Sequence, residues 1–408
     1  MRQRLISFMH SKHLYFRLGL LNLVLVALFG FLMRLKIVFE LPMIDYRNLL
    51  SAHSHFAFGG WVGFMLLSFF TVYLLPSEKR RWFGYLLLLI NGSALGMALT
   101  FPWEGYGAAS LFFSSAFILL TTVYAFAFLR TSLRTIEKTT RMLIYWALLA
   151  MIFSMVGPGL LAWMMSGKSA NPYLHRSAIY WFLHFQYNGF FTLGIFAHYR
   201  SRLAGDPAVR PWAGRFSRLL CAALLPSLFL SLLWLNRPFF YVLGAAGVVL
   251  LLAALYAFVR MWRQSGHLSS HRTLLGRRLL RLSFLSFGLK LLLQAGTIIP
   301  GLGNAVFGDR PVIIGFLHLV FLGFVSFYLL AHLAEEGYFT KTRGGAIPVY
   351  VFATGVFANE GLLMLQGLGV LLGTNSSLFS WGLLGAAGLL LSGALLMALS
   401  AWRRSAGA

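Results

Sequence analysis

Long apolar runs follow one another along the whole chain, and only short polar segments separate them. Each run is about 20 residues long or longer, which is the length a helix needs to cross the hydrocarbon core of a bilayer. The pattern therefore predicts an all-α, polytopic membrane protein of about twelve transmembrane helices. The apolar runs centre on residues 15–33, 49–75, 82–101, 109–129, 142–165, 177–198, 216–235, 239–259, 280–299, 312–331, 348–372 and 377–401.

The composition agrees with this interpretation. Of the 408 residues, 59% are hydrophobic and 11% are charged, with a mean hydropathy of +0.76. A soluble domain carries about a quarter of its residues as charged ones. No polar segment is long enough for a soluble domain, so we expect one transmembrane domain over residues 1–408. Basic residues (Arg2, Arg4 and Lys12) precede the first run and no small-residue cleavage site follows it, so we expect a retained helix.

The net charge of +24 raises the question of nucleic-acid binding, but its distribution indicates topology instead. If the N-terminus is cytoplasmic, the cytoplasmic segments hold 25 of the Lys and Arg residues and the outer segments hold 7. That asymmetry is what the positive-inside rule expects. It predicts an even number of spans with both termini cytoplasmic, in a bacterial inner membrane, and gives no support for a nucleic-acid partner.

Histidines inside predicted spans are candidates for a functional site, because ionisable side chains are costly in hydrocarbon. His53, His184 and His318 lie five to eight residues past the outer ends of three helices that run in the same direction. At about 1.5 Å of rise per residue, they fall at similar depth below the outer surface. Three histidines at one depth is the arrangement that a buried cofactor needs. His55 lies about 200° around the helix from His53, so the two cannot face one ligand position.

A structural role is the alternative for each of these residues, since a lone histidine in a span often bonds only to a carbonyl or a serine. This alternative fits best for His198 and His332, at the cytoplasmic ends of their helices. Lys290 and Glu360 are the other charges within spans, and they predict either a structural ion pair or a proton path. The single cysteine, Cys221, provides neither a disulfide framework nor a cysteine-rich metal site.

Three of the histidine segments resemble a known family. AHSHFAFGG at 52–60, YWFLHFQYNGFF at 180–191 and IGFLHLVFLGFVSF at 314–327 resemble the second, sixth and tenth helices of haem–copper oxidase subunit I. The likeness is nearest to the branch of the cbb-type oxidases and nitric oxide reductases. Twelve helices with both ends inside is also the core topology of that family, so the resemblance implies a subunit I-like bundle.

The resemblance implies roles for individual residues. His53 and His318 match the two axial ligands of the low-spin haem, and His184 matches a copper ligand. Phe316 stands where the family has the high-spin haem ligand, and residues 216–235 contain no histidine to complete the copper site. The resemblance thus implies one low-spin, bis-histidine haem b beside a degenerate binuclear site.

The expected function follows from the one haem that the resemblance implies. A bis-histidine haem b suits electron transfer, because both axial positions are closed to substrates. The resemblance also leaves open the handling of a small gas such as nitric oxide or oxygen. One alternative is a reductase with copper or iron rebuilt around His184, with His55, Tyr187 and Gln294 as further donors. Another is a twelve-helix transporter, although the loop at 76–82 lacks the Gly-Asp-Arg pattern of the major facilitator type. The expected partners are the lipid bilayer, other respiratory subunits, and a quinol or cytochrome c donor.

Overall fold

A computed structural model describes residues 12–131, 133–203, 209–265, 273–339, 343–371 and 376–403. The described residues are helical almost throughout and contain no strand. They divide into two compact units: the first is Met1–Thr121, Arg272–Ser283 and Arg310–Ala408, and the second is Thr122–His271 and Phe284–Asp309. The chain leaves the first unit and returns to it twice, which explains why no boundary appears along the sequence.

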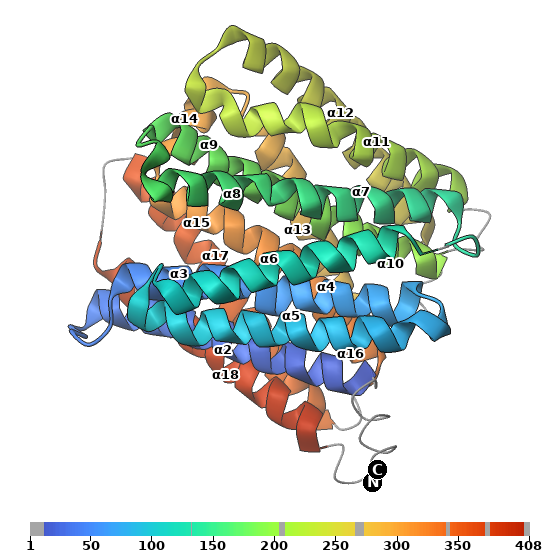
Figure 1. The fold of residues 1–408 in the computed structure, drawn as a ribbon, viewed down its shortest axis with the longest axis horizontal. Coiled ribbons are helices and arrows are strands. Elements are labelled where there is room, and N and C mark those ends of the chain that lie inside the picture. The colour runs from blue at the N-terminus through green and yellow to red at the C-terminus, as the bar shows by residue number, and fades with distance from the viewer. Residues whose placement is uncertain are drawn as a thin grey trace. The chain divides into compact units, whose positions relative to one another are not determined.

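The first unit holds the N-terminal and C-terminal helices (Figure 1). Several of its helices contain π-helical stretches, labelled η1, η2 and η7, and η8 is a short 3₁₀ turn. Its elements are α2 (Lys12–Val38), α3 (Tyr46–Phe56), η1 (Ala57–Gly63), α4 (Phe64–Phe69), η2 (Phe70–Leu74), α5 (Ser77–Glu104), most of α6 (Ala108–Leu129), α15 (Arg310–His318), η7 (Leu319–Ser326), α16 (Phe327–Glu335), η8 (Arg343–Ala346), α17 (Ile347–Leu371) and α18 (Leu378–Arg403).

The second unit holds the middle of the chain. The long helix α13 passes from the first unit into the second at Ser283. The elements of the second unit are α7 (Lys138–Ser154), α8 (Val156–Trp163), η3 (Met164–Lys168), α9 (Pro172–Leu183), η4 (His184–Phe191), α10 (Thr192–Leu203), α11 (Arg210–Leu228), η5 (Phe229–Leu235), α12 (Pro238–Gln264), α14 (Pro300–Gly308) and the larger part of α13 (Leu274–Gly296).

Eleven helical spans in the described residues are long and apolar enough to cross a membrane, so the chain is a multi-pass membrane protein. They match eleven of the twelve predicted runs. The remaining run, 177–198, lies in an unbroken helical stretch formed by α9, η4 and α10. That stretch is long enough to span a bilayer, but it is not among the eleven because His184, Gln186 and Asn188 make it more polar.

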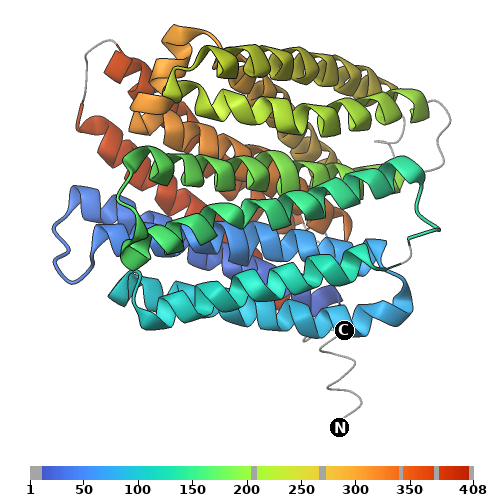
Figure 2. The same cartoon turned by 45° about the horizontal axis from the view of Figure 1, so that its top comes forward.

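Glycines allow close contact between neighbouring helices. α17 and α18 pack together, and a Cβ added at Gly393 would lie 2.5 Å from the backbone nitrogen of Phe352. α11 and α12 run side by side (Figures 1 and 2), and a Cβ at Gly247 would lie 2.8 Å from the backbone nitrogen of Ser227. Small residues at such contacts are how membrane helices gain packing energy without a hydrophobic driving force.

The two ends of the described chain lie on the same side of the first unit. α18 packs against α2 as well as against α17 (Figure 1). The guanidinium carbon of Arg17, near the start of α2, is 5.6 Å from the ring centre of Trp402, near the end of α18. An even number of crossings between α2 and α18 is consistent with this contact.

Candidate functional site

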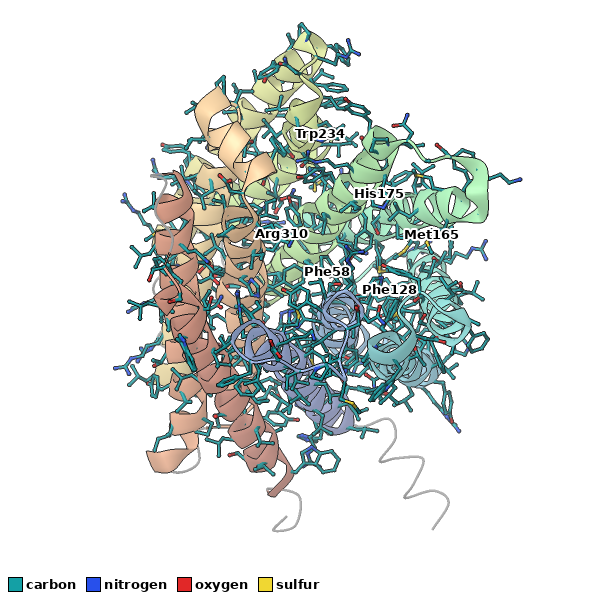
Figure 3. The ribbon with its side chains drawn as sticks, turned by 90° about the vertical axis from the view of Figure 1, so that its left-hand side faces the viewer. Phe58, Phe128, Met165, His175, Trp234 and Arg310 are labelled. Carbon is teal, nitrogen blue, oxygen red and sulfur yellow. The ribbon has the colours of Figure 1, made fainter. Side chains whose placement is uncertain are left out.

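The first unit brings His53 and His318 close to each other. His53 comes from α3 and His318 ends α15; Figure 3 labels Phe58, on the helix of His53, and Arg310, at the start of α15. The centres of the two imidazole rings are 6.5 Å apart, and their planes are tilted by 33°. Helices that are 265 residues apart in sequence thus place two histidines as a pair.

The hydrogen bonds of the pair leave one nitrogen of each ring available. His53 Nδ1 bonds to the carbonyl oxygen of Val26 at 3.1 Å, and His318 Nδ1 bonds to that of Ile314 at 2.8 Å. Because a carbonyl only accepts, both rings carry their proton on Nδ1. Among the described residues neither Nε2 has a hydrogen-bond partner, so each presents a lone pair. Histidines that bind metals are held in this way, with the second ring nitrogen donating to a carbonyl.

Contacts about two helical turns past the two histidines fix their helices against each other. Both helices continue as π-helical stretches, η1 and η7. Such stretches are rare in proteins, and where they occur they are often part of functional sites. The Trp61 indole donates to the Ser326 hydroxyl at 2.8 Å, and both side chains are buried. The ring centres of Phe58 and Phe321 are 4.5 Å apart. These contacts join the two stretches and hold the histidines in register.

The helix that carries His318 is less covered by its neighbours than the helix that follows it. α15 contains no buried residue, whereas every residue of α16 up to Ala334 is buried. On α2, Gly30 faces His53: a Cβ there would lie 3.2 Å from Cε1 of the imidazole. One helical turn further along α2, Arg34 supplies a positive charge that acts on both His53 and His318. The His53 ring therefore packs directly on α2, and a cation lies near the pair.

His55 points to a different neighbourhood, as its position on the helix predicts. Its ring centre is 4.7 Å from that of Phe101 and 5.9 Å from that of Tyr106. Its Nδ1 bonds to the carbonyl oxygen of Ser51 at 2.9 Å. His53, and not His55, is therefore the residue of helix α3 that faces His318.

His184 lies in the second unit and takes part in a buried polar chain. Its Nε2 donates to the carbonyl oxygen of Leu224 at 2.8 Å, and its Nδ1 accepts from Asn188 Nδ2 at 3.0 Å. Asn188 Oδ1 in turn accepts a short hydrogen bond from the Lys290 ammonium. His184 is fully buried, and Lys290 is 1% exposed. Both ring nitrogens of His184 are thus engaged, in the Nε2–H tautomer.

The other candidates near His184 do not complete a metal site in the described part of the chain. Tyr187 is buried, and the Lys290 nitrogen lies 5.9 Å from the centre of its ring. Gln186 donates to the Ser154 hydroxyl at 2.9 Å, and the buried Gln294 Oε1 has no hydrogen-bond partner among the described residues. Across the ranges that the structure describes, no group of three or more His, Cys, Asp or Glu side chains is placed to hold a metal.

The two charges within spans are bonded inside their own units. Lys290 is bonded to Asn188, as described above, and Glu360 Oε1 accepts from Asn359 Nδ2 at 3.0 Å. The sequence pointed to these charges, but it did not indicate that Asn188 is the partner of Lys290. The run of polar residues at 186–188 was the feature of the sequence that could have indicated a partner for Lys290.

His332 lies among aromatic rings at the other end of its helix. Its ring centre is 4.6 Å from that of Phe69 and 4.8 Å from that of Tyr73, and its Nε2 lies 3.7 Å from Glu336 Oε1. His198 is fully buried on α10. Both surroundings fit the structural role expected for these histidines.

The comparisons with known proteins give no further guide. No protein-family model matches the chain, and no curated protein sequence matches it significantly.

Proposed function

We propose that this protein is a haem b-binding membrane protein in which His53 and His318 are the two axial ligands of one low-spin haem. The observation that carries the proposal is the geometry of the pair. Both rings donate from Nδ1 to a carbonyl, both Nε2 lone pairs are available, and the ring centres are 6.5 Å apart.

The separation agrees with ligation of one iron by both rings. An imidazole nitrogen lies about 2 Å from a bound metal. A ring atom lies about 1.2 Å from the ring centre, given ordinary bond lengths. Two rings on opposite sides of one iron therefore have centres about 6.4 Å apart, against the 6.5 Å between His53 and His318. Arg34, whose charge acts on both rings, supplies positive charge for the carboxylates of the haem.

A haem ligated in this way supplies one-electron exchange and offers no open position to a substrate. The residues of the chain then have two tasks. His53 and His318 hold the iron, and their carbonyl partners fix the tautomer and the ring orientation. We infer electron transfer as the activity, with a membrane quinol or a cytochrome c as donor, in a respiratory role. The resemblance to haem–copper oxidase subunit I supports this inference.

The topology that we propose is twelve spans with both termini cytoplasmic, in a bacterial inner membrane. The helical stretch from Pro172 to Leu203 is the span that completes the twelve, and its polar residues lie in the part from His184 onward that its neighbours bury. The contact between Arg17 and Trp402 supports an even number of crossings. The excess of Lys and Arg on the side of both termini supports the orientation.

A rebuilt copper or iron site at His184 finds less support. A metal needs a lone pair on the ligating nitrogen, and in this structure one nitrogen of His184 carries its proton and the other accepts from Asn188. Imidazole sites for copper also need further ligands. His184 is better described as part of the polar chain that reaches Lys290.

The visible spectrum of the purified protein tests the proposal. We expect about one b-type haem per chain with a six-coordinate, low-spin spectrum, measured after expression with ample haem. His53→Ala and His318→Ala should each abolish the low-spin signal, because each removes one axial ligand. A colourless wild-type preparation would refute the proposal.

The matched control is His55→Ala, two residues from His53 on the same helix. Its ring packs on Phe101 and Tyr106, so the low-spin spectrum should survive the change. Loss of the signal in His55→Ala with retention in His53→Ala would show that the ligand assignment is wrong. We also expect no cyanide-sensitive oxygen consumption with an artificial donor, since both axial positions of the haem are closed.

A further inference from the structure

A groove lies between α11 and α12 in the second unit, with a volume of about 440 Å³. Its floor is made of small and apolar side chains that include Ala222, Ala253 and Ala257. Two arginines, Arg215 and Arg218, line it together with Trp212. The wall of the groove is thus apolar, and the two arginines contribute their aliphatic stems to it.

Contacts with aromatic rings hold Arg215 and Arg260, which both lie beside Trp212. The guanidinium carbons of Arg215 and Arg260 lie 4.7 and 4.8 Å from the ring centre of Trp212. Arg260 also donates to the Tyr256 hydroxyl at 2.9 Å. Cation–π contacts of this kind restrain a guanidinium while leaving its edge free to donate hydrogen bonds. Two positive charges are therefore held around one tryptophan.

These charges have no acidic partner in the described part of the chain. No described carboxylate lies within 4 Å of Arg215, Arg218 or Arg260, and all three side chains are exposed. The whole sequence has 10 acidic residues against 34 basic ones, so counter-charges are scarce. A cluster of like charges repels itself unless an anion approaches it.

The cluster lies at the ends of two helices that qualify as membrane spans. Arg215 and Arg218 are within three turns of the start of α11, and Arg260 is within two turns of the end of α12. Trp and Tyr beside Arg at such ends mark the boundary between hydrocarbon and water. Lipid headgroups lie at this level, and acyl chains run along the apolar surface below it.

We propose that this groove binds an anionic phospholipid of the bilayer. The headgroup phosphate meets Arg215, Arg218 and Arg260, and an acyl chain follows the alanine floor between α11 and α12. Charge complementarity selects an acidic headgroup over a zwitterionic one, because basic clusters at the cytoplasmic ends of spans attract acidic lipids. The apolar floor selects a lipid over a soluble phosphate, which gains nothing from it. This inference is independent of haem binding.

Lipid retention by the purified full-length protein tests it. The protein is placed in phosphatidylcholine nanodiscs, and binding of fluorescent phosphatidylglycerol is measured by titration, with glycerol phosphate as the soluble probe. We expect binding of phosphatidylglycerol and none of glycerol phosphate at equal concentration. The double variant Arg215→Gln/Arg218→Gln should bind phosphatidylglycerol about 30-fold more weakly. Each arginine contributes about 1 kcal/mol, and roughly 1.4 kcal/mol corresponds to a tenfold change in affinity.

Two further variants separate the groove from general surface charge. Arg81→Gln/Arg281→Gln removes two exposed arginines elsewhere and should leave binding within about twofold of wild type. Ala222→Phe keeps every arginine but fills the floor, and it should weaken binding to a similar extent as the double variant. Equal loss in both double variants would overturn the proposal, as would equal binding of phosphatidylcholine or of glycerol phosphate.

Discussion

The hydrogen bond between Lys290 and Asn188 gives a direct test of the polar chain in the second unit. Both side chains are buried, at 1% and 7% exposure, and the amide oxygen of Asn188 is the acceptor for the ammonium. The same amide donates to His184 Nδ1 at 3.0 Å. Asn188→Leu keeps the approximate volume of the side chain but leaves a buried ammonium and an imidazole nitrogen without this partner.

The expected loss is large for a single amide. Hydrogen bonds to charged groups contribute about 1.5–3 kcal/mol, and removing one member of a buried pair costs about 3–5 kcal/mol because the other charge stays unsatisfied. We expect Asn188→Leu to lower the free energy of unfolding by about 3 kcal/mol. In a Lys290→Met background the same change should cost only about 1 kcal/mol, which gives a coupling energy of about 2 kcal/mol.

The double-mutant cycle can be measured by unfolding in mixed micelles of neutral detergent and dodecyl sulfate, with helicity as the signal. Asn91→Leu is a matched control in the first unit: Asn91 Oδ1 accepts from a neutral partner, Asn22, at 2.6 Å. Asn22 also donates to the carbonyl oxygen of Gly60 and keeps that bond. We expect a loss of about 1 kcal/mol in the control. A coupling energy near zero would refute the inference that Lys290 depends on Asn188.

Two further predictions concern packing and pH. Gly247→Ala should lower the free energy of unfolding by about 1–3 kcal/mol, because the new Cβ would lie 2.8 Å from the backbone of Ser227; Gly92→Ala, with open space around it, should not destabilise in the same assay. Burial acts to raise the pKa of the Glu137 carboxyl, but hydrogen bonds from Thr139 and Thr140 and the charge of Arg200 together lower that pKa from 4.5 to about 2. The stabilisation by Glu137 is therefore fully present above pH 4.5 and lost as the pH falls toward 2. The stability difference between wild type and Glu137→Gln should shrink over that range, and a pH-independent difference would contradict it.

The spans could be predicted from the sequence because length and hydrophobicity are local properties. Eleven of the twelve runs form helices that are long and apolar enough to cross a membrane. The apolar residues of the run at 177–198 predict a further span, and the structure has a helix there. Its polar residues make this helix less hydrophobic than the other eleven spans. Those residues are satisfied by contacts with other helices, such as the bond from Gln186 to Ser154, which local sequence does not reveal.

The π-helical stretches could not be predicted, although they adjoin all three histidine candidates. η1 begins shortly after His53, η4 begins at His184 and η7 follows His318. Each stretch contains glycine, but so do many ordinary spans in a chain with 41 glycines. A change in winding rotates every later side chain about the helix axis, so the helical wheel alone misplaces the residues that follow. The separate directions of His53 and His55 could be predicted because they precede η1.

Position within the spans could not distinguish His318 from His184, since both lie at similar predicted depth, and only the resemblance gave them different roles. The hydrogen bonds separate them. His318 donates from Nδ1 to a carbonyl and keeps the lone pair of Nε2, which is the state in which imidazole binds iron or another metal. His184 donates from Nε2 to Leu224 and accepts at Nδ1 from Asn188, so neither nitrogen has a lone pair to offer. The choice depends on which carbonyl or amide a partner presents to the ring, and one of these partners, Leu224, is 40 residues away in sequence. The capacity to bind a metal therefore depends on the tautomer that the fold imposes, and this is why His53 and His318 are the histidines we assign to haem.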